Sequence, residues 1–232
     1  MKKKKGNIMS YAGTFGALLI LFVILALASP NFLKFDNMMS ILKQTTFNAL
    51  LSTGMLLCLI TAGIDLSVGA NATFAACMCG FLVTRGVTNS FVLIVVALLT
   101  GTLVGMVNGL LLTRLHLPHP FVSTLGMKNV LWGAALLVTA SKMISFSGIN
   151  GLLWLGSSTM KGFPVSFVIV ILIYILMHIL LTKTALGRSV YCAGGNPEAT
   201  RLSGINSANV LTFCYTLSGF MAALAGIVSI GR

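Results

Sequence analysis

Apolar stretches of roughly 20 residues recur along the whole chain, and this is the length that an α-helix needs to cross a hydrocarbon layer about 30 Å thick. Only 8% of the residues are charged, against roughly 25% in soluble globular domains. One water-soluble core could not bury so many apolar segments. We therefore expect an all-α, polytopic transmembrane helical bundle with about seven spans: 11–28, 47–62, 66–83, 91–112, 121–140, 164–181 and 208–230.

The formal charge of +12 comes from 15 Lys and Arg residues scattered between the apolar stretches. Because they build no basic face, we interpret them as loop and interface charges and expect no nucleic-acid partner. The one cluster, Lys2–Lys5, precedes the first span, where it favours a cytoplasmic N-terminus and contact with membrane lipid. Residues 26–28 also resemble a signal-peptidase site, but the many later spans favour an uncleaved first helix.

Only Gly63-Ile64-Asp65 separates the second and third spans, so these two are predicted to form a helical hairpin. Gly63 suits the end of the first helix. Asp65 suits the N-cap of the next helix, where its carboxylate accepts hydrogen bonds from free backbone N–H groups. The segment before the hairpin, with Asp36 and Lys43, is expected to be a loop.

Gly101, Gly105 and Gly109 recur at intervals of four in the fourth span. This spacing gives the helix one smooth face, which another helix can approach closely. Packing within the chain is the expected use of this face, and packing against a second chain is the alternative.

The fifth span contains Lys128, which is costly in hydrocarbon unless it reaches the interface or a wet cavity. As an alternative, the chain enters the membrane only partway near 124–126 and the full helix begins later. The following segment, 141–163, is expected to be a loop in which Trp154 anchors the interface. His178, in the sixth span, is expected to be neutral and hydrogen-bonded between helices.

Acidic residues are rare: Asp36, Asp65 and Glu198 are the only three, and the predicted spans keep them away from helix centres. Proton- and sodium-coupled carriers usually place ionisable groups at mid-membrane, and hydrolases need paired carboxylates, so neither class is expected. The sequence contains no GxxxxGKS or GxxxxGKT loop for ATP and no HExxH motif. We therefore expect no catalytic residue, no metal and no cofactor in this chain.

A short helix with both ends marked is predicted from Asn196. Asn196 suits the N-cap, Pro197 the first helical position and Gly204 the C-terminal stop. Glu198 and Arg201 are three apart and can form an ion pair. Such a rigid helix between spans suits the docking of a soluble protein, and a helix lying on the membrane surface is the alternative. The docking residues would be Asn196, Pro197, Glu198, Ala199, Arg201, Leu202, Ser203 and Gly204.

Three blocks of the sequence resemble one family. Residues 61–69, TAGIDLSVG, resemble the TGGIDLSVG signature of ABC-importer permeases in the ribose, xylose, galactose and autoinducer-2 branch. Pro120-Phe121 with 124–127 forms the second block. Gly187-Arg188 followed by 194–205 forms the third, which is similar to the family's GGNxEAARLSGI segment.

The resemblance implies the membrane permease subunit of a binding-protein-dependent ABC sugar importer in a bacterial inner membrane. Its partners would be a cytoplasmic ABC ATPase that carries ATP and Mg, an extracytoplasmic sugar-binding protein, and a second permease chain, identical or different. By the same resemblance, 1–232 is one permease domain, and 183–207 is a cytoplasmic loop with the helix that couples to the ATPase. Four residues would form a structural turn near the translocation path: Gly63, Asp65, Ser67 and Gly69.

The chain departs from the family pattern in three respects. Ala62 and Thr200 replace the usual Gly and Ala, and Lys128 is unusual at its position. The family has roughly ten spans, so we expect this chain to be the first part of such a permease, truncated at the C-terminus. Two other classes stay open: a passive channel or facilitator for small polar solutes, which Asn48, Asn71 and Asn108 would suit, and a non-transporting scaffold.

Overall fold

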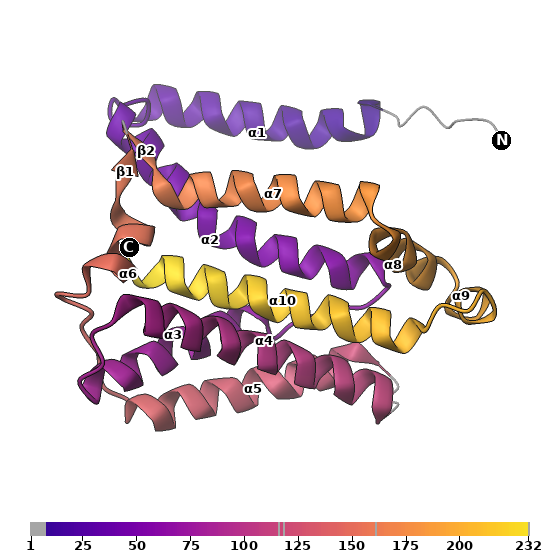
Figure 1. Cartoon of the computed structure of the whole chain (residues 1–232). Helices are drawn as coiled ribbons and strands as arrows, with labels where there is room; N and C mark the ends of the chain where they lie inside the picture. Colours follow the sequence, from indigo (N-terminus) through magenta and orange to yellow (C-terminus); the bar gives the residue numbers. More distant parts are fainter. Residues whose placement is uncertain (1–7, 116, 118, 161, 232) are drawn as a thin grey trace. The chain divides into compact units, whose positions relative to one another are not determined.

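The computed structural model describes residues 8–115, 117, 119–160 and 162–231, and the chain there is helical almost throughout (Figure 1). The predicted cytoplasmic anchor, Lys2–Lys5, lies outside the described residues. The elements are α1 (Ile8–Ala28), α2 (Phe35–Ile60), α3 (Val68–Thr84), α4 (Ser90–Arg114), α5 (Pro120–Thr139), α6 (Asn150–Ser157), β1 (Thr159–Met160), β2 (Phe163–Pro164), α7 (Val165–Lys183), α8 (Ala185–Gly195), α9 (Pro197–Leu202) and α10 (Ser207–Ile230).

The chain divides into two compact units, Met1–Leu42 and Lys43–Arg232. In the first unit, the rings of Phe22 and Phe32 pack edge to face, with their centroids 5.3 Å apart. The second unit holds the rest of α2 and all later elements. That 1–232 forms one permease domain stays a prediction.

Each of the seven predicted spans corresponds to a helix: α1, α2, α3, α4, α5, α7 and α10. In the described part of the chain, 4 helices, namely α4, α5, α7 and α10, are long and apolar enough to cross a membrane. Apolar helices of shorter length are found at Ala12–Ala28 and Val68–Thr84. The predicted all-α, polytopic membrane fold is therefore confirmed.

α10 is the central helix of the second unit, with α2 and α4 on either side of it (Figure 1). Of its most apolar window, 61% is buried, against 22% for α4 and α7. Its buried residues include Ala222, Ala223, Ala225 and Gly226, whose small side chains keep the helix narrow. A narrow helix lets several neighbours approach at once, and α10 accordingly packs against α3, α4, α6 and α8.

The glycines of α4 lie against the backbone of α10. A Cβ on Gly105 would meet the carbonyl oxygen of Tyr215 directly, and one on Gly109 would lie 2.8 Å from the Cα of Thr212. Gly101 faces Gly219. Residue numbers thus rise along α4 as they fall along α10, so the two helices run antiparallel. The partner of the glycine face is thus another helix of the same chain. We call this contact the glycine seam.

Three segments predicted as loops contain regular structure. α2 begins at Phe35, well before the predicted residue 47, because Asp36 lies in its first turn, where a carboxylate favours the positive end of the helix dipole. The predicted loop 141–163 contains α6, which covers the end of α10 by placing Gly156 directly against the carbonyl oxygen of Val228. The polar connection after α7 contains α8 as well as the predicted short helix.

α5 is continuous from Pro120 to Thr139, so the alternative of partial entry near 124–126 is wrong. Proline is compatible with this start because the first helical residue needs no hydrogen-bonded N–H.

The glycine seam predicts that Gly105→Ala destabilises the protein by about 1–3 kcal/mol, because α4 and α10 must separate to admit the methyl group. Gly133→Ala on α5 is the matched control: nothing lies within 4 Å of its Cβ position, and no loss is expected. Thermal unfolding in detergent, followed by circular dichroism, compares the two variants. Equal stability would contradict the close approach of the helices.

Candidate functional site

The signature segment forms the link between α2 and α3, residues 61–67, which we call the signature connection. It is longer than the predicted three-residue turn because α2 ends at Ile60 and α3 begins at Val68. Thr61, Asp65 and Ser67 are buried while Ala62 and Ile64 are exposed, so one side of the connection faces the interior of the second unit. Backbone that leaves a helix inside a membrane protein needs polar partners from its neighbours, and the following contacts supply them.

α2 ends in a Schellman motif, in which the N–H of Gly63 donates to the carbonyl of Cys58 at 2.8 Å and that of Ala62 to Leu59 at 3.0 Å. The left-handed residue of the motif is Ala62, with φ 58°. The prediction that Gly63 closes the helix was therefore wrong by one residue. Gly63 is required for space instead, because a Cβ there would lie 2.6 Å from the hydroxyl oxygen of Tyr215.

Asp65 is 1% exposed and is not the N-cap of α3, which is Ser67. One carboxylate oxygen accepts from the Ser67 N–H at 3.0 Å and from the Ser67 hydroxyl at 2.6 Å. The other accepts from the hydroxyl of Ser218 at 2.9 Å. Ser218 stands at the middle of the 24-residue helix α10, so the carboxylate lies at mid-helix depth. Asp65 itself lies between helices, as predicted, but its burial and its bond to the middle of α10 were not predicted.

Two asparagines extend this polar cluster. The amide nitrogen of Asn108, on α4, donates to the Ser67 hydroxyl at 2.8 Å, and that of Asn71, on α3, donates to the carbonyl of Gly101 at 3.1 Å. Both side chains are buried, and within the described residues neither amide oxygen has a hydrogen-bond partner. Gly69, the last residue of the predicted structural turn, lies in the first turn of α3.

The carbonyl of Ile64 joins the connection to two more helices. Tyr215 of α10 donates its hydroxyl to this oxygen at 3.4 Å. The hydroxyl oxygen of Thr124 on α5 also lies 3.4 Å from it, while its proton has a shorter acceptor at 2.8 Å in the carbonyl of Pro120. The signature connection therefore contacts α4 through the Ser67 hydroxyl, α10 through Ile64 and Asp65, and α5 at Thr124.

The predicted docking helix is present as α9. The side-chain oxygen of Asn196 accepts from the N–H groups of Glu198 at 3.1 Å and Ala199 at 3.0 Å, and Pro197 follows as the first residue. The helix ends at Leu202 with Ser203 as its C-cap, and Gly204 follows with a φ of +81°, which suits glycine. Both ends of this helix are thus fixed by local bonds.

The surface of α9 is exposed and carries a fixed ion pair. Arg201 holds Glu198 with two hydrogen bonds, at 2.7 and 3.2 Å, and this contact lowers the pKa of Glu198 from its ordinary value. Leu202, beside this pair, is 77% exposed. Ala199, Ser203 and Gly204 are exposed beside it.

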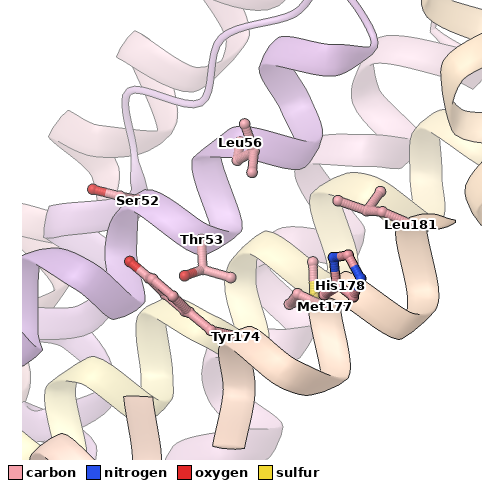
Figure 2. Close-up of a pocket in the computed structure, with 7 residues that line it drawn as sticks. All are labelled: Ser52, Thr53, Leu56, Tyr174, Met177, His178 and Leu181. Carbon is pink, nitrogen blue, oxygen red and sulfur yellow. The ribbon is translucent and has the colours of Figure 1, made fainter. Parts of the chain in front are cut away.

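A groove of about 400 Å³ opens between α2 and α7 (Figure 2). Tyr174 reaches from α7 toward Ser52 and Thr53 on α2 (Figure 2). The lining is mostly apolar, which fits an aliphatic chain better than a polyhydroxy solute. His178 is exposed in this groove, so the prediction that it bonds between helices was wrong. The lining residues are Ser52, Thr53, Leu56, Tyr174, Met177, His178 and Leu181.

The left-handed conformation of Ala62 predicts that Ala62→Gly raises the free energy of unfolding by about 0.5–1 kcal/mol, because glycine adopts positive φ without steric cost. Ala49→Gly, inside α2, should instead lower it by about 1 kcal/mol. Chemical unfolding of the two variants in detergent provides the comparison. A loss of stability in both would show that Ala62 is not strained.

Comparison with known proteins identifies the family. Residues 37–231 match the family described as the permease component of branched-chain amino acid transport systems. A ribose import permease protein of Haemophilus influenzae is 34% identical over 98% of this chain and 71% of its own length. A ribose import permease protein of Escherichia coli is 35% identical over 93% and 68%.

A galactofuranose transporter permease protein of Escherichia coli is 36% identical over 91% of this chain and 64% of its own length. No solved structure matches the chain. The signature connection and the docking helix both lie within the matched residues. The chain therefore belongs to this family of transport-system permeases and is itself a polytopic membrane permease.

Proposed function

We propose that this chain is the transmembrane subunit of an ATP-driven importer in a bacterial inner membrane. It forms the translocation pathway for a monosaccharide or a related small polar solute, which an extracytoplasmic binding protein delivers. Relatives named as ribose, fructose and galactofuranose permeases support the sugar class. The observation that carries the ATP-driven part is the exposed, doubly capped helix α9.

α9 is suited to receive force from a soluble partner. Its caps and the Glu198–Arg201 ion pair hold the helix in one conformation. The helix therefore loses little conformational entropy when a partner binds. The exposed Leu202 supplies an apolar contact next to this charged pair. We assign the partner as a cytoplasmic ABC ATPase, which brings ATP and Mg to the assembly.

This assignment fixes the orientation. α8 and α9 lie on the cytoplasmic side, as does the N-terminus. Arg114, at the end of α4, belongs to the same side because its guanidinium donates to Asn209 of α10 at 3.3 Å. α6 and the β1–β2 ribbon then lie on the outer side, where the binding protein would dock.

One face of α5 supplies polar groups for the pathway. Lys128 and Asn129 are exposed near the middle of this 20-residue helix. A lysine in the middle of a membrane-spanning helix is costly against lipid, so we place this side of α5 toward the water-filled translocation pathway. A second permease chain, identical or different, would close that path from the other side.

The docking assignment predicts that Glu198→Arg reduces co-purification of the detergent-solubilised chain with its ATPase by about tenfold, because it replaces the ion pair with two like charges. Asp36→Arg makes the same change of charge at an exposed residue of the first unit and should leave co-purification unchanged. Pull-down at equal protein concentrations measures both. Failure of the wild-type chain to bind, or equal binding by Glu198→Arg, would contradict the assignment.

A further inference from the structure

We call α8 and α9 together the docking segment. The signature connection is in contact with this segment through α8. Gly194 of α8 lies directly against the carbonyl oxygen of Ile60, and a Cβ there would lie 3.1 Å from the Cα of Thr61. No side chain separates the two backbones at this point. A displacement of α8 therefore acts on the residues where α2 ends and the connection begins.

The docking segment reaches the same connection by a second route, through α10. The hydroxyl of Ser207, the first residue of α10, donates to the carbonyl of Pro197 in α9 at 3.1 Å. Asn206 caps α10 by accepting from the N–H of Asn209 at 3.1 Å. Further along α10, Tyr215 and Ser218 bind Ile64 and Asp65 of the connection.

The far side of the connection contacts the helix that we assign to the pathway. The hydroxyl oxygen of Thr124, on α5 one helical turn before Lys128, lies 3.4 Å from the carbonyl oxygen of Ile64. The connection thus lies between the docking segment and α5. The bond from Ser218 to Asp65 is buried and directional, so the connection must move with α10 or break it.

We propose that the signature connection carries the movement of the docking segment to the pathway, and that Asp65 is the positioning residue that ties it to α10 through Ser218. The inference rests on the proposed function, since it requires an ATPase that moves α8 and α9. Asp65 touches no substrate in this account. It keeps the connection in register with α10 while the importer changes state.

The test compares two buried serines in the complete importer, reconstituted with its ATPase and binding protein in proteoliposomes. Ser218→Ala removes the hydroxyl that binds Asp65. Ser166→Ala makes the same change on α7, where the hydroxyl is buried but has no hydrogen-bond partner among the described residues. The readout is the number of sugar molecules imported per ATP hydrolysed, which the amount of folded complex does not alter.

Ser218→Ala should lower this ratio by about fivefold or more, with ATP hydrolysis retained, and Ser166→Ala should leave it unchanged. Asp65→Asn should couple nearly as well as the wild type, because its amide can still bond Ser218. An unchanged ratio in Ser218→Ala overturns the inference and leaves the proposed function standing. Absence of ATP-dependent import by the wild-type complex would instead overturn the proposed function.

A measurement on the unmodified complex covers the case in which Ser218→Ala does not fold. Hydrogen exchange is followed with and without a non-hydrolysable ATP analogue. The amides of 61–67 should change their exchange rate when the ATPase binds nucleotide, while those of Asn150–Ser157, at the opposite end of α10, should not. Unchanged exchange in 61–67 would also overturn the inference.

Discussion

The close approach of α4 to α10 is the constraint on which the rest of the second unit depends. Gly101, Gly105 and Gly109 let the two backbones touch, and no larger residue fits at these positions without separating the helices. Lipid tails are as apolar as leucine, so contact area and hydrogen bonds must hold helices together inside a membrane. The glycine seam supplies the contact area, and it places Asn108 of α4 and Ser218 of α10 on either side of the signature connection.

The signature connection is possible because α10 and α4 stand so close. A buried carboxylate is costly unless its oxygens are bonded, and the oxygens of Asp65 accept three hydrogen bonds from Ser67 and Ser218. The same side chain holds a non-helical stretch of backbone between two helices. A rigid polar centre of this kind can pass on a displacement, which a loose loop would absorb. This links the packing of the bundle to the transport cycle that we propose.

The local features of α9 were predicted well from the sequence, whereas the caps at Gly63 and Asp65 and the features that depend on distant residues were not. The ends of α9 follow from Asn196, Pro197 and Gly204, which act within a few residues of each other. The depth of Asp65 could not be predicted, because it depends on Ser218, 153 positions away. A short link between two spans suggests a turn at the membrane surface. Nothing in the segment TAGIDLSVG itself indicates that a serine of α10 binds its aspartate inside the bundle. The family's usual glycine at position 62 was the one available signal for the left-handed Ala62.

The central claim is that this permease moves its solute only when ATP is hydrolysed by a partner. Uptake of labelled ribose into proteoliposomes that contain the chain, its ATPase and its binding protein tests this claim most directly. The account predicts uptake when ATP and both partners are present, and none when ATP or either partner is omitted. Uptake by the chain alone, at the same rate with and without ATP, would contradict it and would identify a passive facilitator.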